Sequence, residues 1–298
     1  MSEIKLFSID GDVRERISSE VILEKELQTL IERNMEIFFG VRFLKSEYAI
    51  TNGRMDSIGI DENNSPVIFE YKRSQNENVI NQGLFYLDWL MDHKADFKLL
   101  VIEQLGMEAA NKIDWSVPCV ICIAHDFTKY DVHAVNQMQK NIKLVSYRKY
   151  NSDLILFEHL NAPVIKPSME NSAGDENGKN YSQKTHLEKL STAPQNLKNL
   201  YFSICDFIES LGDDISKNQL KLYLAYKKVQ NVVCIEVYSK QIILFLKLDP
   251  ESLTLEKGFT RNMKNVGHYG TGDLQVIIKN TRDFEKAKPL LERAYHEA

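Results

Sequence analysis

The most informative stretch of the chain is Phe69-Glu-Tyr-Lys72, where an acidic and a basic residue stand two positions apart after an apolar run. Alternate residues of a strand project from the same face of a sheet, so Glu70 and Lys72 are expected to point the same way. An earlier alternating run contains Asp56, and the Asp/Asn/Ser-rich turn at 61–65 predicts that the two runs pair as a hairpin. Pairing would bring Asp56 close to Glu70.

Two converging carboxylates are typical of a site for a hard, oxygen-seeking cation such as Mg²⁺ or Mn²⁺. Such a cation lowers the pKa of a bound water and polarises a phosphate. Lys72 would orient the attacking water or stabilise the charge that develops on the phosphate. The pattern therefore predicts metal-assisted phosphodiester hydrolysis. An isolated E-x-K pair is equally typical of an ordinary ion pair on a sheet surface, so the surrounding residues matter.

Two further polar residues could complete this site. Glu26 lies at the margin of the apolar face of a helix that is expected over about 18–38. Glu20 and Glu24 are rivals for the same role on that helix. Gln82 lies near the start of the helix that follows the Lys72 strand, and its amide could bond a phosphate or a metal-bound water.

Residues 20–92 resemble the core of the PD-(D/E)XK, or restriction endonuclease-like, superfamily, and are most similar to its NucS-like branch. Four segments carry the resemblance: Leu23-Glu-Lys-Glu-Leu-Gln-Thr-Leu-Ile-Glu-Arg-Asn34, Gly53-Arg-Met-Asp-Ser-Ile-Gly-Ile-Asp61, Val67-Ile-Phe-Glu-Tyr-Lys-Arg73 and Gln82-Gly-Leu-Phe-Tyr86. Members of that branch cleave DNA with a divalent metal, and the resemblance implies the same activity and substrate here.

The resemblance also implies roles for individual residues. The catalytic set would be Glu26, Asp56, Glu70, Lys72 and Gln82, with its three acidic members as ligands of Mg²⁺ or Mn²⁺. The chain departs from the superfamily pattern at Met55, where a proline is common. The motifs are specific for the fold and the metal site and weaker for the substrate.

The predicted elements around these residues favour an α/β fold: a restriction endonuclease-like mixed-sheet core flanked by helices. The helix over about 18–38 should end at Gly40. The remaining expected elements are strands near 4–9, 41–44, 48–50, 54–60, 66–72, 117–124, 142–147 and 153–158, and helices near 77–92, 95–111 and 130–140.

A polar stretch that contains Gly and Pro predicts a linker at 166–196 between a nuclease-like domain at 1–165 and a small α+β domain at 197–298. In the latter we expect helices near 197–211 and 281–296 and strands near 220–226, 232–238, 241–248 and 274–278. This domain resembles a small uncharacterised domain found at the C-terminus of nuclease-like proteins, which implies no activity. It is a possible substrate-binding module.

Several residues outside the catalytic set are candidates for contact with nucleic acid. Arg54, Arg73 and Lys94 could bind phosphates, although each is also explained by ordinary surface charge. His268 and Tyr269 lie in a Gly-rich segment and could stack on a base, although a tight loop before a strand is the favoured explanation. Residues His125 and Asp126 have no nucleophile paired with them and are interpreted as structural.

Composition and charge limit the classes of function that the chain can have. The net charge is −5, and residues 179–298 hold 18 Lys and Arg against 14 Asp and Glu, so the C-terminal part carries +4 and the rest −9. A mildly basic half could help to hold a polyanion, although ordinary scatter also explains it. No apolar run approaches the roughly 20 residues of a membrane span, which argues against a membrane role and favours a cytoplasmic protein. The four cysteines are expected to be buried and unpaired.

The leading hypothesis is a divalent-metal-dependent endonuclease acting on DNA, either alone or as a homodimer. The alternative is a nucleic-acid-binding or sensing protein that has the nuclease fold but cleaves little by itself. A third hypothesis is a scaffold for small-molecule or protein interactions, because fold does not determine function.

Overall fold

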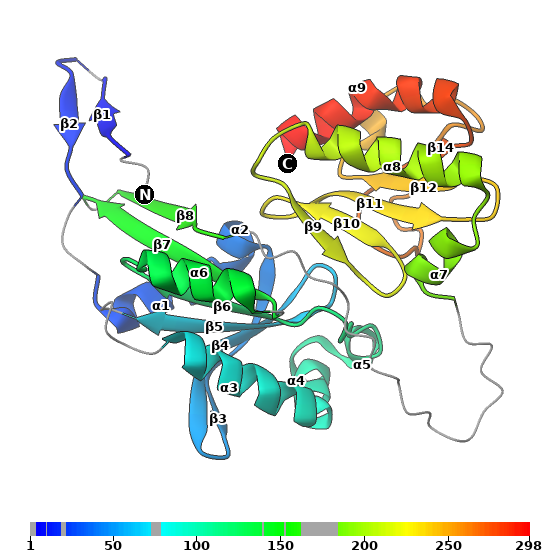
Figure 1. Ribbon diagram of the computed structural model, residues 1–298. Helices are drawn as coiled ribbons and strands as arrows, with labels where there is room; N and C mark the ends of the chain where they lie inside the picture. The colour runs from blue at the N-terminus through cyan, green and yellow to red at the C-terminus, as the bar shows by residue number, and fades with distance from the viewer. Residues whose placement is uncertain are drawn as a thin grey trace. The chain divides into compact units, whose positions relative to one another are not determined.

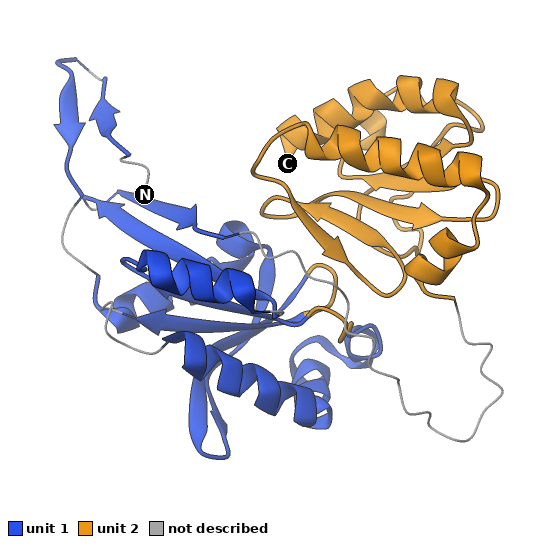
Figure 2. Ribbon diagram, in the orientation of Figure 1, with its two compact units in different colours: residues 1–61, 66–113, 118–163 blue, residues 62–65, 114–117, 164–298 orange. Residues whose placement is uncertain are grey.

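The computed structural model describes residues 4–9, 11–18, 22–72, 79–138, 140–151, 153–161 and 184–298. The chain divides into two compact units (Figure 2). Unit 1 comprises residues 1–61, 66–113 and 118–163, and unit 2 comprises residues 62–65, 114–117 and 164–298. The predicted linker 166–196 is described only from residue 184, where it contains helix α7 (His186–Ser191) and the start of helix α8 (Gln195–Glu209).

Unit 1 is built on a six-stranded mixed sheet in the order β3-β4-β5-β6-β7-β8, with helices packed around it (Figure 1). Its strands are β3 (Val41–Ile50), β4 (Gly53–Asp61), β5 (Pro66–Lys72), β6 (Cys119–Ala124), β7 (Ile142–Tyr150) and β8 (Leu154–His159). The pairs β5–β6 and β6–β7 are parallel and the others antiparallel. The predicted mixed-sheet α/β core is therefore confirmed. The separate strands expected at 41–44 and 48–50 are one strand.

Helices cover both faces of this sheet. They are α1 (Glu24–Arg33), α2 (Met35–Phe39), α3 (Val79–Asp92), α4 (Lys94–Leu105), α5 (Met107–Ala110) and α6 (Lys129–Gln137). The apolar sides of α1 and α2 bury against a face that includes Phe69 and Ile121. Helix α3 packs on the opposite face, where Gly83 approaches the neighbouring strand residue Val120.

The single helix expected at 18–38 is wrong in its extent. The helix begins at Glu24, and Asn34 leaves the helical conformation, so that α1 and α2 are separate. Gly40 ends α2 in the left-handed conformation, at φ 64°, as the sequence predicts. A short hairpin of β1 (Leu6–Ser8) and β2 (Arg14–Arg16) precedes these elements.

Unit 2 is a two-layer α+β structure. Its sheet is antiparallel, in the order β13-β14-β12-β11-β10-β9, and α8 and α9 (Thr281–Glu297) bury their apolar sides against one face. The strands are β9 (Ser216–Gln219), β10 (Leu224–Lys227), β11 (Asn231–Val237), β12 (Ile242–Leu246), β13 (Thr260–Asn262) and β14 (Leu274–Ile278), and a 3₁₀ turn lies at Pro250–Ser252. Strands β9 and β13 are polar and short, so no alternation revealed them in the sequence.

The Gly-rich segment before β14 lies against the strands of unit 2. A Cβ on Gly272 would lie 2.8 Å from the backbone of β12, and φ is +126° there. The glycine is thus required by close backbone approach, as the tight-loop interpretation states. All four cysteines are buried and free, as expected. No helix in the described part of the chain is long and apolar enough to cross a membrane.

The contact between α3 and β6 can be tested with Gly83→Ala. Alanine favours a helix over glycine by about 1 kcal/mol, but the new Cβ would lie 2.7 Å from Cγ1 of Val120. We therefore expect a net loss of about 1–3 kcal/mol in the free energy of unfolding, measured by chemical denaturation. In a Val120→Ala background the same change should be neutral or stabilising. An equal cost in both backgrounds would contradict the packing explanation.

Candidate active site

Asp56 and Glu70 lie at adjacent positions on β4 and β5, where the pairing of these strands ends. The last pair of the ladder is Ser57 opposite Phe69, and the next positions along the strands are Asp56 and Glu70. The backbone N–H of Asp56 donates to Oε1 of Glu70 at 3.3 Å, and the N–H of Tyr71 donates to Oδ2 of Asp56 at 3.0 Å. Side-chain oxygens thus take the place of ladder carbonyls, and the two carboxylates are held together as the sequence predicts.

The Glu70 carboxylate is in an unusual state for a buried polar group. The residue is 0% exposed, and its Oε2 has no hydrogen-bond partner among the described residues. Burial, with the negative charge of Asp56 adding to it, raises the pKa of Glu70 to about 9. Burial also raises the pKa of Asp56, against the opposing effect of the Tyr71 N–H. A cation between the two carboxylates would relieve this unfavourable arrangement.

Among the described residues, Asp56 and Glu70 form a pair of acidic side chains rather than part of a larger cluster of ligand-type side chains. In the part of the chain that the structure describes, no group of three or more His, Cys, Asp and Glu side chains is placed to hold a metal ion. Mg²⁺ commonly binds through one or two carboxylates and keeps several waters, so a pair is sufficient for that type of ion.

Lys72 faces a carboxylate from helix α1, but a different one from the expected residue. Its Nζ lies 4.0 Å from Oε1 of Glu24, and the Lys72 side chain is only 14% exposed. Glu26 is exposed on the helix surface, so the expectation that Glu26 joins the carboxylate pair is not met. The reason is helical rotation: two residues along a helix turn the side chain by about 200°, so only one of Glu24 and Glu26 can face the sheet.

A buried amide ties the same helix to the site. Gln28 lies one turn after Glu24 and is 3% exposed. Its Nε2 donates to the backbone carbonyl of Asp56 at 2.8 Å and to Oε1 of Glu32 at 2.9 Å. Glu32 in turn accepts a hydrogen bond of 2.6 Å from the Ser57 hydroxyl. Positions 24, 28 and 32 therefore form one polar line along α1, and this spacing of four was the signal that could have identified Glu24.

Gln82 belongs to a small polar cluster at the start of β4. Its Nε2 donates to the Tyr86 hydroxyl at 2.9 Å, and that hydroxyl also accepts a hydrogen bond of 3.4 Å from the backbone of Arg54. The pair joins α3 to the β3–β4 hairpin two residues before Asp56. Gln82 is half-buried there.

Glu47 is a residue that sequence reasoning missed. In the β3–β4 ladder, Ser46 pairs with Ser57 and Tyr48 with Met55, so Glu47 lies opposite Asp56. The register follows from the two-residue turn between Ile50 and Gly53. Counting back from that Thr-Asn turn would have placed Glu47 beside the site. Burial raises the pKa of Glu47, but hydrogen bonds from Lys25 and Gln28 outweigh it, and the net pKa is lowered.

The remaining predicted contact residues have varied surroundings. Arg73 lies outside the described residues. Lys94 is half-buried at the first position of α4. In unit 2, His268 stacks on Phe245 with ring centroids 4.2 Å apart, so one face of its ring is occupied, whereas Tyr269 is 41% exposed. Nucleic-acid contact by these residues stays a prediction.

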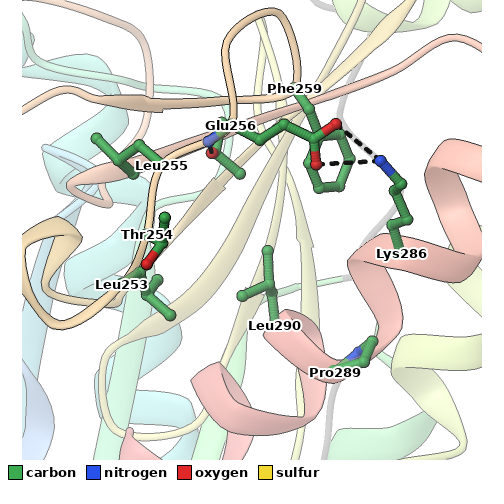
Figure 3. A pocket seen from close by; sticks show the side chains of 9 residues that line it. Leu253, Thr254, Leu255, Glu256, Phe259, Lys286, Pro289 and Leu290 are labelled. Carbon is green, nitrogen blue, oxygen red and sulfur yellow. Dashed lines mark hydrogen bonds and ion pairs between the residues drawn. The ribbon is translucent and has the colours of Figure 1, made fainter.

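Figure 3 shows a hollow in unit 2 between α9 and the segment 253–260. Its volume is about 300 Å³, and its lining consists of Leu253, Thr254, Leu255, Glu256, Phe259, Thr260, Lys286, Pro289 and Leu290. Lys286 donates to both oxygens of Glu256, at 2.8 and 3.0 Å, so the charged groups at its edge neutralise each other. None of the predicted site residues lines it.

Comparison with known proteins relates the chain to a nuclease family. Residues 23–113 match the family model described as the Endonuclease NucS C-terminal domain, and the matched range contains Glu24, Asp56 and Glu70 together with Lys72 and Gln82. An uncharacterised protein of Haemophilus influenzae is 31% identical over 303 residues, which cover 98% of this chain and 99% of that protein. The chain belongs to the same family as this protein and to the NucS-like branch of the restriction endonuclease-like superfamily.

Solved structures with partial similarity include a repair endonuclease from Pyrococcus abyssi, at 20% identity and a TM-score of 0.28. That match covers 46% of this chain and 50% of the other, so this chain spans about half the length of the known enzyme. EndoMS in its apo form matches at 22% identity over 46% of this chain and 49% of the other, with a TM-score of 0.29. SfsA from Pyrococcus furiosus, in complex with Ca²⁺, matches at 12% identity, over 52% and 74% of the two chains, with a TM-score of 0.29.

In this NucS-like chain, Glu70→Gln should stabilise the metal-free protein by on the order of 2 kcal/mol near neutral pH. The native pKa of about 9 lies above the ordinary value of 4.5. The free energy of unfolding of the wild type therefore falls as the pH rises from 4.5 toward about 9, because the folded protein disfavours the ionised form of Glu70. A glutamine side chain does not ionise, so the variant avoids that loss. Chemical denaturation with a chelator present measures the effect.

The matched control for that experiment is Glu26→Gln, at an exposed position of the same unit. It should change the free energy of unfolding by less than about 0.5 kcal/mol. A Glu70→Gln protein that is less stable than wild type without metal would contradict the electrostatic account of the carboxylate pair.

Proposed function

We propose that this protein is a divalent-metal-dependent endonuclease that hydrolyses phosphodiester bonds in DNA. The observation that carries the proposal is the buried pair of Asp56 and Glu70, in which Oε2 of Glu70 lacks a hydrogen-bond partner among the described residues. Membership of the NucS-like branch supports nuclease chemistry, and the name of the matched family supports endonucleolytic action.

Asp56 and Glu70 would hold Mg²⁺ or Mn²⁺, because both offer oxygen ligands and Glu70 has an oxygen left to coordinate. The bound ion would supply an activated water and polarise the phosphate of the bond to be cut. The protein's own contribution is to exclude water from the Glu70 side and to fix both carboxylates through backbone N–H groups.

Lys72 is the residue that we assign to the reacting phosphate. It follows Glu70 by two positions on β5, so both side chains leave the same face of the strand. An ammonium group there can stabilise negative charge that grows on the phosphate. Glu24 replaces Glu26 in this proposal, because its carboxylate lies 4.0 Å from the Lys72 ammonium and can orient it. Gln82 would support the substrate side from α3.

Cleavage tests the assignments directly. Asp56→Asn, Glu70→Gln and Lys72→Met should each lower the rate of cleavage of a mixed set of DNA structures by about 10²-fold or more. Glu24→Gln should lower it by roughly tenfold or more, because the Lys72 ammonium would no longer be oriented by a carboxylate. Unchanged cleavage in the first three variants would overturn the proposal.

The comparison of Glu24→Gln with Glu26→Gln decides which glutamate of α1 belongs to the site. We expect Glu26→Gln to cleave like the wild type, since its side chain is exposed. A loss confined to Glu26→Gln would restore the assignment made from sequence. DNA binding without cleavage in the wild type would instead favour the alternative of a nucleic-acid-binding or sensing protein.

Metal uptake gives an independent measurement. Isothermal titration of Mn²⁺ should show binding to the wild type and none to Asp56→Asn/Glu70→Gln. Titration in the presence of a short, uncleavable DNA should tighten the binding, because substrate phosphate can complete the coordination. Equal uptake by the double variant would place the metal elsewhere and contradict the assigned ligands.

A further inference from the structure

Glu47 extends the row of carboxylates across a third strand. It lies on β3 opposite Asp56, which in turn is adjacent to Glu70 on β5. Its backbone has φ of 53°, in the left-handed region, although it lies inside a ten-residue strand. A non-glycine residue held in that region costs on the order of 1 kcal/mol or more and persists where its surroundings demand it.

The Glu47 carboxylate holds two cations, one with each oxygen. Lys25 Nζ donates a hydrogen bond of 3.0 Å to Oε1, and Arg54 Nε lies 2.6 Å from Oε2 in an ion pair without hydrogen-bond geometry. The Glu47 side chain is 29% exposed, whereas the Lys25 and Arg54 side chains are 68% and 63% exposed. Because the ion pair uses Nε of Arg54, the two terminal nitrogens of the guanidinium remain for a second partner.

A purely stabilising role does not account for this arrangement. Exposed ion pairs contribute about 0–1 kcal/mol each. The left-handed backbone costs a similar amount or more, and glycine or asparagine would adopt it with less strain. A glutamate at this position therefore adds little to the stability of the fold. Its role is better explained by the positions in which it holds the two cations.

The site needs such cations because its substrate is a polyanion. Negative charge on Glu47 and Asp56 would repel a phosphodiester chain, and dissolved salt screens charges at such short distances only weakly. Arginine with free terminal nitrogens binds phosphate in a bidentate manner when its direction is set by a carboxylate. Arg54 precedes Asp56 by only two residues, so a phosphate bound by it would lie near the carboxylate pair.

We propose that Glu47 is a positioning residue that holds Arg54 and Lys25 as a paired clamp for a substrate phosphate next to the bond that is cut. This inference rests on the proposed nuclease function. Glu47 acts through the two cations and does not hold the metal. Its carboxylate sets the direction of the guanidinium, and the terminal nitrogens of Arg54 meet the phosphate.

The test uses Glu47→Asn, because asparagine tolerates a positive φ and removes the longer carboxylate. We expect thermal stability to be equal to or higher than that of the wild type. Affinity for a short DNA duplex, measured with a chelator present, should fall by about tenfold. The slope of log affinity against log salt should become shallower by about 0.9 for each phosphate that the variant no longer binds.

A mutant cycle shows whether Glu47 acts through the two cations that it contacts. Adding Glu47→Asn to Lys25→Ala/Arg54→Ala should weaken DNA binding no further, because both cations that Glu47 would position are already absent. Losses that add, or DNA affinity that is unchanged or higher in Glu47→Asn, would overturn the proposal. Conservative Glu47→Asp should recover part of the affinity, whereas a residue with a merely structural role would show a change in stability only.

Two controls separate this inference from the proposed function. Mn²⁺ uptake by Glu47→Asn should match that of the wild type, and its loss would make Glu47 a metal ligand and overturn the positioning role. If wild-type protein binds and cleaves DNA while Glu47→Asn does so equally well, only this inference fails. If wild-type protein neither binds nor cleaves any DNA, the nuclease proposal fails and this inference falls with it.

Discussion

Two carboxyl groups held side by side and away from water are the constraint on which unit 1 depends. Asp56 and Glu70 meet where β4 and β5 stop pairing, and each carboxylate bonds to backbone N–H of the opposite strand. The arrangement satisfies the backbone but leaves one Glu70 oxygen without a hydrogen-bond partner among the described residues. Such an arrangement lowers the stability of the fold, a cost that is consistent with our proposal that a cation binds between the two carboxylates.

The rest of unit 1 keeps that pair in place from both sides of the sheet. On one side, Gln28 of α1 bonds the carbonyl of Asp56 and the Glu32 carboxylate, so the helix cannot rotate without breaking buried hydrogen bonds. On the other side, Gly83 lets α3 approach β6 closely. Close packing of the surrounding residues thereby holds Asp56 and Glu70 next to each other, although their proximity by itself is unfavourable.

Charge around the site is balanced by pairs rather than by an excess of basic residues. Lys72 faces Glu24, and Glu47 holds Lys25 and Arg54. Each pair keeps a flexible cation in a defined direction, which lowers the entropy lost when a phosphate is bound. Such pairs would allow a chain with a net charge of −5 to bind the polyanionic substrate that we propose.

Local patterns in the sequence determined much of unit 1: strand alternation placed Glu70 and Lys72 on one face, the hairpin brought Asp56 beside them, and Gly40 ended the helix. Short-range periodicity is sufficient there because the chain between those residues is short and regular. Only the tertiary structure showed that Glu24, rather than Glu26, is the glutamate of α1 that faces Lys72. Only the tertiary structure, likewise, placed Glu47 opposite Asp56. Rotation of α1 depends on its contacts with distant strands, and a register across three strands brings together residues that no local pattern connects.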